Sequence, residues 1–129
     1  MPNNAPVAQR TITVSVHGNN DKHRITYSYW SLKGIQYHQA PVCDLLCDSP
    51  TCFLFNLDHD STINGWTITG ITPGENFSPL EATPGPYYLS VATYDPHTDD
   101  QVHHFTINYL NTLTGISHSV DPQEGNIPG

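Results

Sequence analysis

Short runs in which apolar and polar residues alternate recur along the chain, and they constrain the fold more than any other feature. In residues 11–16, Ile12, Val14 and Val16 alternate with hydroxyl residues, as in a strand with one buried face. The pattern predicts an all-β fold, an antiparallel β-sandwich of about seven strands with immunoglobulin-like topology. A jelly roll or a small barrel is the competing architecture. The runs that we expect to be strands are residues 11–16, 25–30, 52–57, 66–69, 87–94, 102–110 and 113–120.

We expect a single β-sandwich domain over residues 1–129. The chain keeps one character throughout, and its 129 residues are enough for a core that needs no disulfide or metal. A flexible N-terminus is expected over about residues 1–9 and a C-terminal tail over residues 122–129. Leu45 and Leu46 could form one helical turn, and we expect no helix longer than this.

The charge of the chain excludes several classes of partner. A net charge of −8 argues against binding to nucleic acid or to an anionic membrane surface. No stretch near 18 apolar residues is present, and the first ten residues lack the features of a signal peptide, so we expect a cytoplasmic protein. An exposed sheet edge could pair two subunits into a homo-oligomer. The basic residues are Arg10, Lys22, Arg24 and Lys33, too few for a basic patch.

The bond between Asp121 and Pro122 is the candidate for chemistry. Proline has no backbone N–H, so the aspartate cannot form a succinimide with the following nitrogen. The remaining route is attack of the Asp121 carboxylate on its own carbonyl carbon, which expels the proline nitrogen. Tethering a nucleophile in the right geometry can supply about 7–11 kcal/mol of a barrier. The alternative is structural, because most Asp-Pro pairs are turn formers, and the chain contains a second one at Asp95-Pro96.

The last hairpin is expected to place His103 near this bond. A two-residue loop at Asn111-Thr112 would set His103 opposite Val120 and Val102 opposite Asp121. Phe105, Ile107 and Ile116 would then share one inward face, and a slip of one residue would reverse every side chain.

Several side chains could assist cleavage. His103 could donate a hydrogen bond to the developing oxyanion or act as general acid. Glu124 could be that acid, or could position the water for the hydrolytic half of the reaction. Asn126 could donate hydrogen bonds to a carbonyl, and Asp99 or Asp100 could activate a water. The hypothesis therefore assigns catalysis to Asp121, His103 and Glu124, with Asn126, Asp99 and Asp100 in support.

The C-terminal motif Asp121-Pro122, Glu124 and Pro128, with Asn126 between, resembles the signature of the DP-EP family. These are small bacterial β-sandwich proteins, and the similarity in length and strand content covers most of the chain. The resemblance implies aspartic-type peptidase activity, expressed as self-cleavage at Asp121-Pro122. It also implies that the C-terminal peptide stays attached without a covalent bond, as the protein's own partner. If members of the family use a lysine or another amine in this region, the chain offers none nearby, and an amine-dependent step of the cleavage would lack its catalytic group.

Three cysteines, Cys43, Cys47 and Cys52, lie within ten residues, with His38 upstream. Four ligands could form a zinc site, but the spacing lacks the usual C-x2-C pair. Buried or unreactive thiols are the preferred interpretation, and a disulfide from Cys43 to Cys47 or Cys52 is the other option. The acidic run at residues 58–60 is read as a solvated turn rather than a metal-binding fragment. We therefore expect no metal and no cofactor.

A second function from another class remains open. The chain could be a non-catalytic binding module for a protein or a carbohydrate. In that case exposed aromatic side chains would contact the partner, although aromatic residues in strands are more often part of a core. The candidates are Tyr37, Trp66, Tyr87 and Tyr88.

Overall fold

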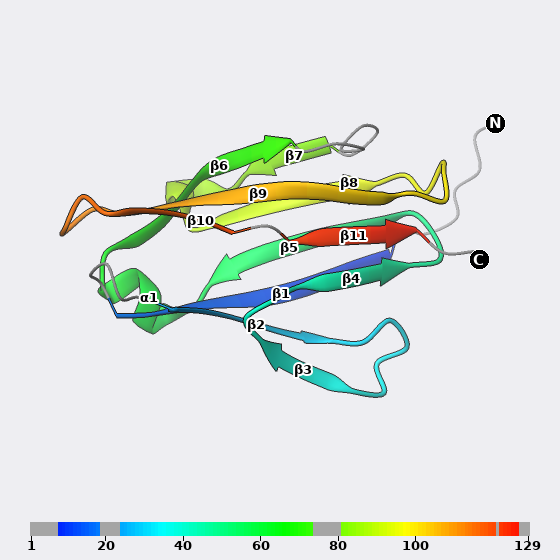
Figure 1. Ribbon diagram of the computed structural model, residues 1–129, viewed down its shortest axis with the longest axis horizontal. Coiled ribbons are helices and arrows are strands. Elements are labelled where there is room, and N and C mark those ends of the chain that lie inside the picture. The colour runs from blue at the N-terminus through cyan, green and yellow to red at the C-terminus, as the bar shows by residue number, and fades with distance from the viewer. Residues whose placement is uncertain (1–7, 19–23, 74–80, 121, 127–129) are drawn as a thin grey trace.

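The protein folds as a sandwich of two β-sheets, which confirms the prediction of an all-β sandwich (Figure 1). The computed structural model describes residues 8–18, 24–73, 81–120 and 122–126. Within these ranges it contains eleven strands, one short α-helix and one 3-10 helix. No helix in this part of the chain is long and apolar enough to cross a membrane. The immunoglobulin-like topology stays a prediction.

One sheet contains six strands and the other five. The spatial order of the six is β3 (Tyr37–Ala40), β2 (Arg24–Trp30), β1 (Ala8–His17), β5 (Thr51–Leu57), β8 (Ser90–Asp95) and β7 (Glu81–Pro84). In the second sheet β9 (Val102–Asn111) pairs along one edge with β6 (Trp66–Pro73). Its other edge pairs with β10 (Ser117–Val120) and β11 (Gln123–Asn126), and β11 also pairs with β4 (Asp44–Cys47).

All seven predicted runs contain strands, but the expected arrangement is incomplete. The predictions missed β3, β4, β7 and β11, each four residues long. Two pairs, β1 with β5 and β4 with β11, are parallel, so the sheets are not purely antiparallel. The helical turn expected at Leu45-Leu46 is wrong, because these residues belong to β4.

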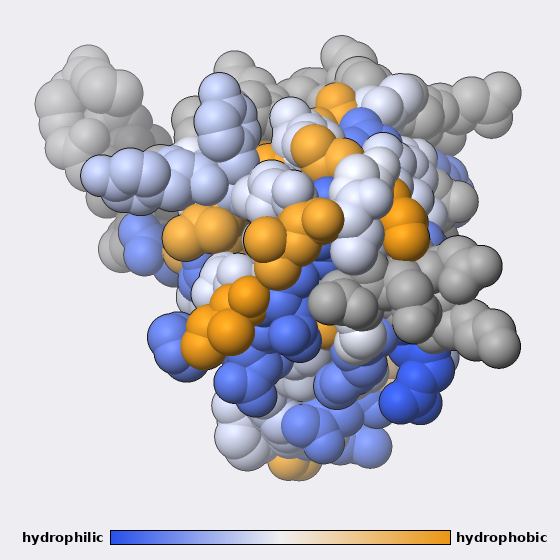
Figure 2. All heavy atoms as spheres, turned by 90° about the vertical axis from the view of Figure 1, so that its left-hand side faces the viewer, coloured by the Kyte–Doolittle hydropathy of each residue, from blue (hydrophilic) through white to orange (hydrophobic). Residues whose placement is uncertain are grey.

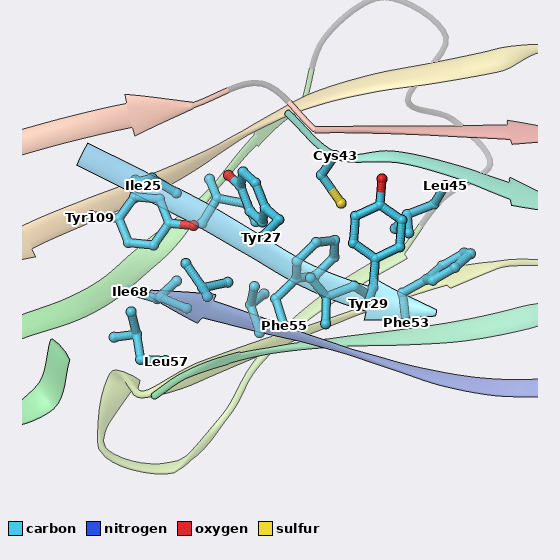
Figure 3. Close-up of a cluster of buried hydrophobic side chains, with 14 of the residues drawn as sticks. Ile25, Tyr27, Tyr29, Cys43, Leu45, Phe53, Phe55, Leu57, Ile68 and Tyr109 are labelled. Carbon is cyan, nitrogen blue, oxygen red and sulfur yellow. The ribbon is translucent and has the colours of Figure 1, made fainter. Parts of the chain in front are cut away.

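The core lies between the two sheets. Apolar side chains from alternate positions of β1, β2, β5 and β9 meet there, as alternation predicts (Figure 3). The rings of Phe55 and Phe105, from opposite sheets, meet edge to face with their centroids 5.9 Å apart. Trp66, a candidate for partner contact under the alternative binding function, is instead fully buried in this core, and its ring nitrogen donates a hydrogen bond to the carbonyl of Gly18.

A short helix, which the sequence analysis missed, begins immediately after β5. It is α1 (His59–Ile63), and Asp58 caps its N-terminus by accepting a hydrogen bond from the Ser61 amide. Partial burial opposes ionisation of Asp58, but hydrogen bonds from Ser15 and Ser61 outweigh it and lower its pKa. The acidic run at residues 58–60 is therefore a helix start rather than a solvated turn. The 3-10 helix is Pro86–Tyr88.

The C-terminal strand is part of the sheet, which corrects the prediction of a tail over residues 122–129. In Figure 1, β11 lies between β9 and β4. Along β9, Val120 lies opposite Ile107 and Glu124 lies opposite His103. Glu124 is four residues after Val120, and His103 is four residues before Ile107. The strands β10 and β11 therefore pair with β9 in the same register, one before and one after residues 121–122. At the other terminus, β1 already begins at Ala8, within the segment expected to be flexible.

The β9–β10 turn is longer than the predicted two-residue loop, and the expected register is wrong by four residues. The predicted partner of His103 was Val120, which instead faces Ile107. The longer turn depends on Asn111, whose buried side-chain oxygen accepts hydrogen bonds from the Leu113 and Thr114 amides. Because the shift is even, the inward face of β9 is unchanged.

Replacing Asn111 with alanine is expected to lower the free energy of unfolding by about 2 kcal/mol. The side chain also donates a hydrogen bond to the carbonyl of Asn64, so its loss leaves groups on two elements without a partner. Urea unfolding monitored by tryptophan fluorescence measures the change. An alanine variant within 0.5 kcal/mol of the wild type would contradict this role.

The end of the sandwich that carries α1 and this turn is shown in Figure 2. Hydrophobic side chains lie there between hydrophilic ones. Ile63 of α1 and Leu113 of the turn are among the exposed large hydrophobic residues.

Candidate functional site

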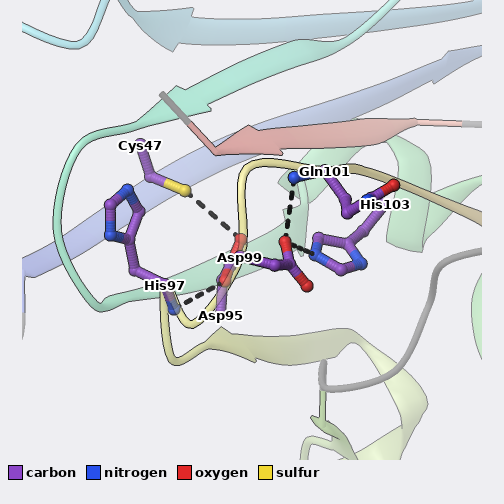
Figure 4. Close-up of polar contacts among 6 residues, drawn as sticks. All are labelled: Cys47, Asp95, His97, Asp99, Gln101 and His103. Carbon is purple, nitrogen blue, oxygen red and sulfur yellow. Dashed lines mark hydrogen bonds and ion pairs between the residues drawn. The ribbon is translucent and has the colours of Figure 1, made fainter. Parts of the chain in front are cut away.

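A histidine–aspartate pair lies where β9 begins (Figure 4). His103 is fully buried, and its Nε2 lies 3.0 Å from Asp99 Oδ1. Asp99 also accepts a hydrogen bond from the Gln101 amide, at 2.9 Å, so the turn before β9 holds the carboxylate in place. The other ring nitrogen, Nδ1, is buried and has no hydrogen-bond partner among the described residues. Asp99 thus orients the imidazole and leaves one nitrogen available.

A buried carboxyl lies on the neighbouring strand. Glu124 of β11 is fully buried, and one of its oxygens accepts a hydrogen bond from the Thr93 hydroxyl on β8 of the opposite sheet. The other oxygen, Oε2, has no hydrogen-bond partner in the described part of the chain. Burial raises the pKa of Glu124 to about 8, Thr93 lowers it, and the charge of Asp95 raises it further. Glu124 therefore carries a proton at neutral pH.

His103 and Glu124 are directly opposite each other in the β9–β11 pair. Residues opposed in an antiparallel pair have Cβ atoms about 4.5–5.5 Å apart, and their side chains lie on the same face of the sheet. Here that face is the sandwich interior, where both side chains are excluded from water. Each carries one polar atom without a described hydrogen-bond partner. Two groups able to exchange protons are thus adjacent in a dry environment.

Replacing Thr93 with valine is expected to lower the free energy of unfolding by about 1–2 kcal/mol at pH 6, because it removes the hydroxyl hydrogen bond to a buried carboxyl. The same change should raise the pKa of Glu124, since that hydrogen bond lowers it. Urea unfolding across pH 5–10 measures both effects. Thr93→Ser, which keeps the hydroxyl, is the control. An unchanged pH dependence in the valine variant would contradict the assigned contact.

A second polar cluster lies at the end of β8 (Figure 4). Asp95 is fully buried and accepts hydrogen bonds from the Cys47 thiol, at 3.3 Å, and the His97 amide, at 2.9 Å. Burial raises the pKa of the Cys43 and Cys47 thiols, which keeps them neutral. All three cysteines are free, so the disulfide option is wrong. Within the described ranges, no three metal-ligating side chains gather into a metal site.

The other predicted site residues are placed as follows. Pro122 is buried, and its carbonyl accepts a hydrogen bond from the Phe105 amide at 3.4 Å. Asp121 lies outside the described residues. Asn126 ends β11 opposite Cys47, and its side chain is also outside the described part. Asp100 is exposed, in contrast to Asp99.

Thr93 was not among the predicted site residues, and Asp95 was expected only in a turn. Val91, Thr93 and Asp95 occupy alternate positions of β8, and all three are buried. Period-two alternation starting from Val91 would have placed both polar residues on the core face.

Comparison with protein-family models and with curated proteins found no matching family and no matching relative.

Proposed function

We propose that this protein cleaves its own backbone once, at the bond between Asp121 and Pro122. The observation that carries the proposal is the buried carboxyl of Glu124, two residues after Pro122, whose pKa burial raises to about 8. Glu124 lies on a strand that continues the register of β10 along β9, so pairing with β9 holds the strand before residue 121 and the strand after Pro122. The resemblance of the C-terminal motif to the DP-EP signature supports the same reaction.

The reaction has two steps. A side-chain oxygen of Asp121 attacks the carbonyl carbon of the same residue, the C–N bond to Pro122 breaks, and a cyclic anhydride forms. The proline nitrogen takes up a proton and leaves as a secondary amine. Water then opens the anhydride, which leaves Asp121 with two free carboxyl groups. Because attacking and attacked atoms belong to one residue, tethering contributes about 7–11 kcal/mol.

The described residues suggest separate roles in these steps. Glu124 holds a proton at neutral pH and is assigned as the general acid for the leaving nitrogen. His103, oriented by Asp99, is assigned as the group that accepts a proton from water during hydrolysis. Thr93 positions the Glu124 carboxyl.

Intact mass spectrometry and N-terminal sequencing after incubation at pH 7 test the proposal. We expect fragments that end at Asp121 and begin at Pro122, and none from Asp121→Ala. Asp95-Pro96 is an internal control, because nonspecific acid hydrolysis would cut both Asp-Pro bonds. An unbroken wild-type chain would contradict the proposal, as would equal cutting at the two bonds or cutting in the alanine variant.

A binding function is the second candidate, and one observation favours it. An open pocket of about 320 Å³ lies beside Trp30, which is 55% exposed, and Arg10 contributes to its wall. The Trp30 and Tyr37 ring centroids lie 5.0 Å apart and both side chains are exposed, so the pair is accessible to a ligand such as a sugar. Titration of simple sugars monitored by tryptophan fluorescence tests this role, with Tyr37→Ala as the variant that should weaken binding and an unchanged wild-type signal as the contradicting result.

A further inference from the structure

The position of β11 resembles that of a bound peptide. The strand has four residues and pairs antiparallel with β9 and parallel with β4. An extended segment in this position therefore pairs with the edge of β9 on one side and with the edge of β4 on the other, and joins the two strands into one sheet (Figure 1). Backbone hydrogen bonds to strand edges are a general way of binding peptides.

The side chain of Glu124 gives this gap its selectivity. It enters the interior opposite His103 of β9 and Leu45 of β4, and meets Thr93 of the facing sheet. An interior enclosed in this way accepts a neutral acid or an amide and opposes a charge. The charged and titratable groups around the carboxyl are Arg10 of β1, Cys43 before β4, Cys47 of β4, Asp95 of β8 and His103 of β9.

We propose that the gap between β9 and β4 is a peptide-binding site, and that the C-terminal strand of a second copy of this chain can replace the chain's own β11 there. The site takes an extended segment whose inward side chain is a neutral carboxylic acid or a carboxamide. The proposal rests on the proposed function in one respect, because cutting before Pro122 would leave β11 held by noncovalent contacts alone.

Protonation of Glu124 controls this exchange. A displaced strand exposes the carboxyl to water, where its pKa returns to the ordinary value, whereas docking raises it. The docked state binds the proton more tightly, so docking is favoured at low pH and weakens as the pH rises through the docked pKa. From a pKa of about 8 when docked, linkage predicts that docking weakens by about 100-fold between pH 6 and pH 9.5.

The test uses a fluorescent peptide with the sequence of residues 122–129. Wild-type protein is dialysed at pH 9.5 to remove any released segment, returned to pH 6 and titrated with the peptide under fluorescence anisotropy. We expect binding at pH 6 that weakens by about 100-fold at pH 9.5. A peptide with the Glu124→Gln change should bind equally at both pH values, and one with Glu124→Lys should not bind. Equal binding of the lysine peptide would overturn the site.

Hydrogen exchange in Asp121→Ala tests the site without cleavage. Protection of residues 123–126 should fall by about 100-fold between pH 6 and pH 9.5, relative to the same protein with Glu124→Gln, while protection in the middle of β9 stays high. An uncut wild type with this pH-dependent opening would reject self-cleavage and support the site. A cut protein that neither releases nor takes up the peptide, with no such opening, would overturn the site and leave self-cleavage standing.

Discussion

Replacing Glu124 with glutamine is expected to raise the free energy of unfolding at pH 9 by as much as about 5 kcal/mol and to change it little at pH 4. The folded protein holds the Glu124 proton up to a pKa of about 8, whereas the unfolded chain releases it near 4.5. Between these values the folded state binds more protons, so the stability of the wild type falls as the pH rises. Each pKa unit corresponds to about 1.4 kcal/mol, and glutamine cannot ionise.

Urea unfolding of both proteins from pH 4 to pH 9 measures this effect. The buried thiols also have raised pKa values, but they are present in both proteins and cancel in the comparison. Asp100→Asn removes an exposed carboxyl and is the matched control, with a pH dependence close to that of the wild type. A difference between Glu124→Gln and wild type that is the same at every pH would contradict the buried, protonated state.

The second large effect is expected from Phe55→Ala, which should lower the free energy of unfolding by about 3–5 kcal/mol. Phe55 is fully buried on β5, and its ring meets Phe105 of the opposite sheet edge to face. Alanine removes this contact and leaves a cavity between the two layers. Urea or thermal unfolding at pH 6 gives the value, and Phe55→Leu, which fills part of the space, should lose less. A loss below about 1 kcal/mol for alanine would show that the two layers do not depend on this contact.

The strands that could be predicted are those whose own sequence carries the alternation. In residues 11–16 each inward position is apolar, and the strand is found there. By contrast β11 consists of Gln, Glu, Gly and Asn, which have little intrinsic preference for strands. It forms because β9 and β4 pair with it from both sides. Such tertiary pairing is not encoded within the four residues themselves.

The sequence predicted which side chains of the last hairpin point into the core, but not the register in which its two strands pair. Phe105 and Ile107 are buried as expected, because the even shift preserved the pattern. The register itself depends on the side chain of Asn111, which holds a longer turn through contacts with Asn64, a residue distant in sequence. A local turn rule cannot include that contact.

Some residues of the candidate site could be predicted from the sequence, but their arrangement in space could not. Asp99 was proposed from the turn before the last hairpin and His103 from the expected register of that hairpin, and the two side chains form a hydrogen bond. The partner across the strand is Glu124 rather than Val120, which changes the chemistry from one histidine to an adjacent acid and imidazole. Thr93 comes from the opposite sheet, so its contact with Glu124 depends on how the two layers stack.

The most direct test of self-cleavage is the mass of the wild-type protein after incubation at pH 7 in water enriched in oxygen-18. The proposed mechanism predicts a fragment that ends at Asp121 and carries one heavy oxygen, which tandem mass spectrometry finds partly on the side-chain carboxyl and partly on the terminal carboxyl. This distribution follows because water can open the anhydride at either carbonyl. A chain that remains whole, or a heavy oxygen confined to the terminal carboxyl, would contradict attack by the Asp121 side chain.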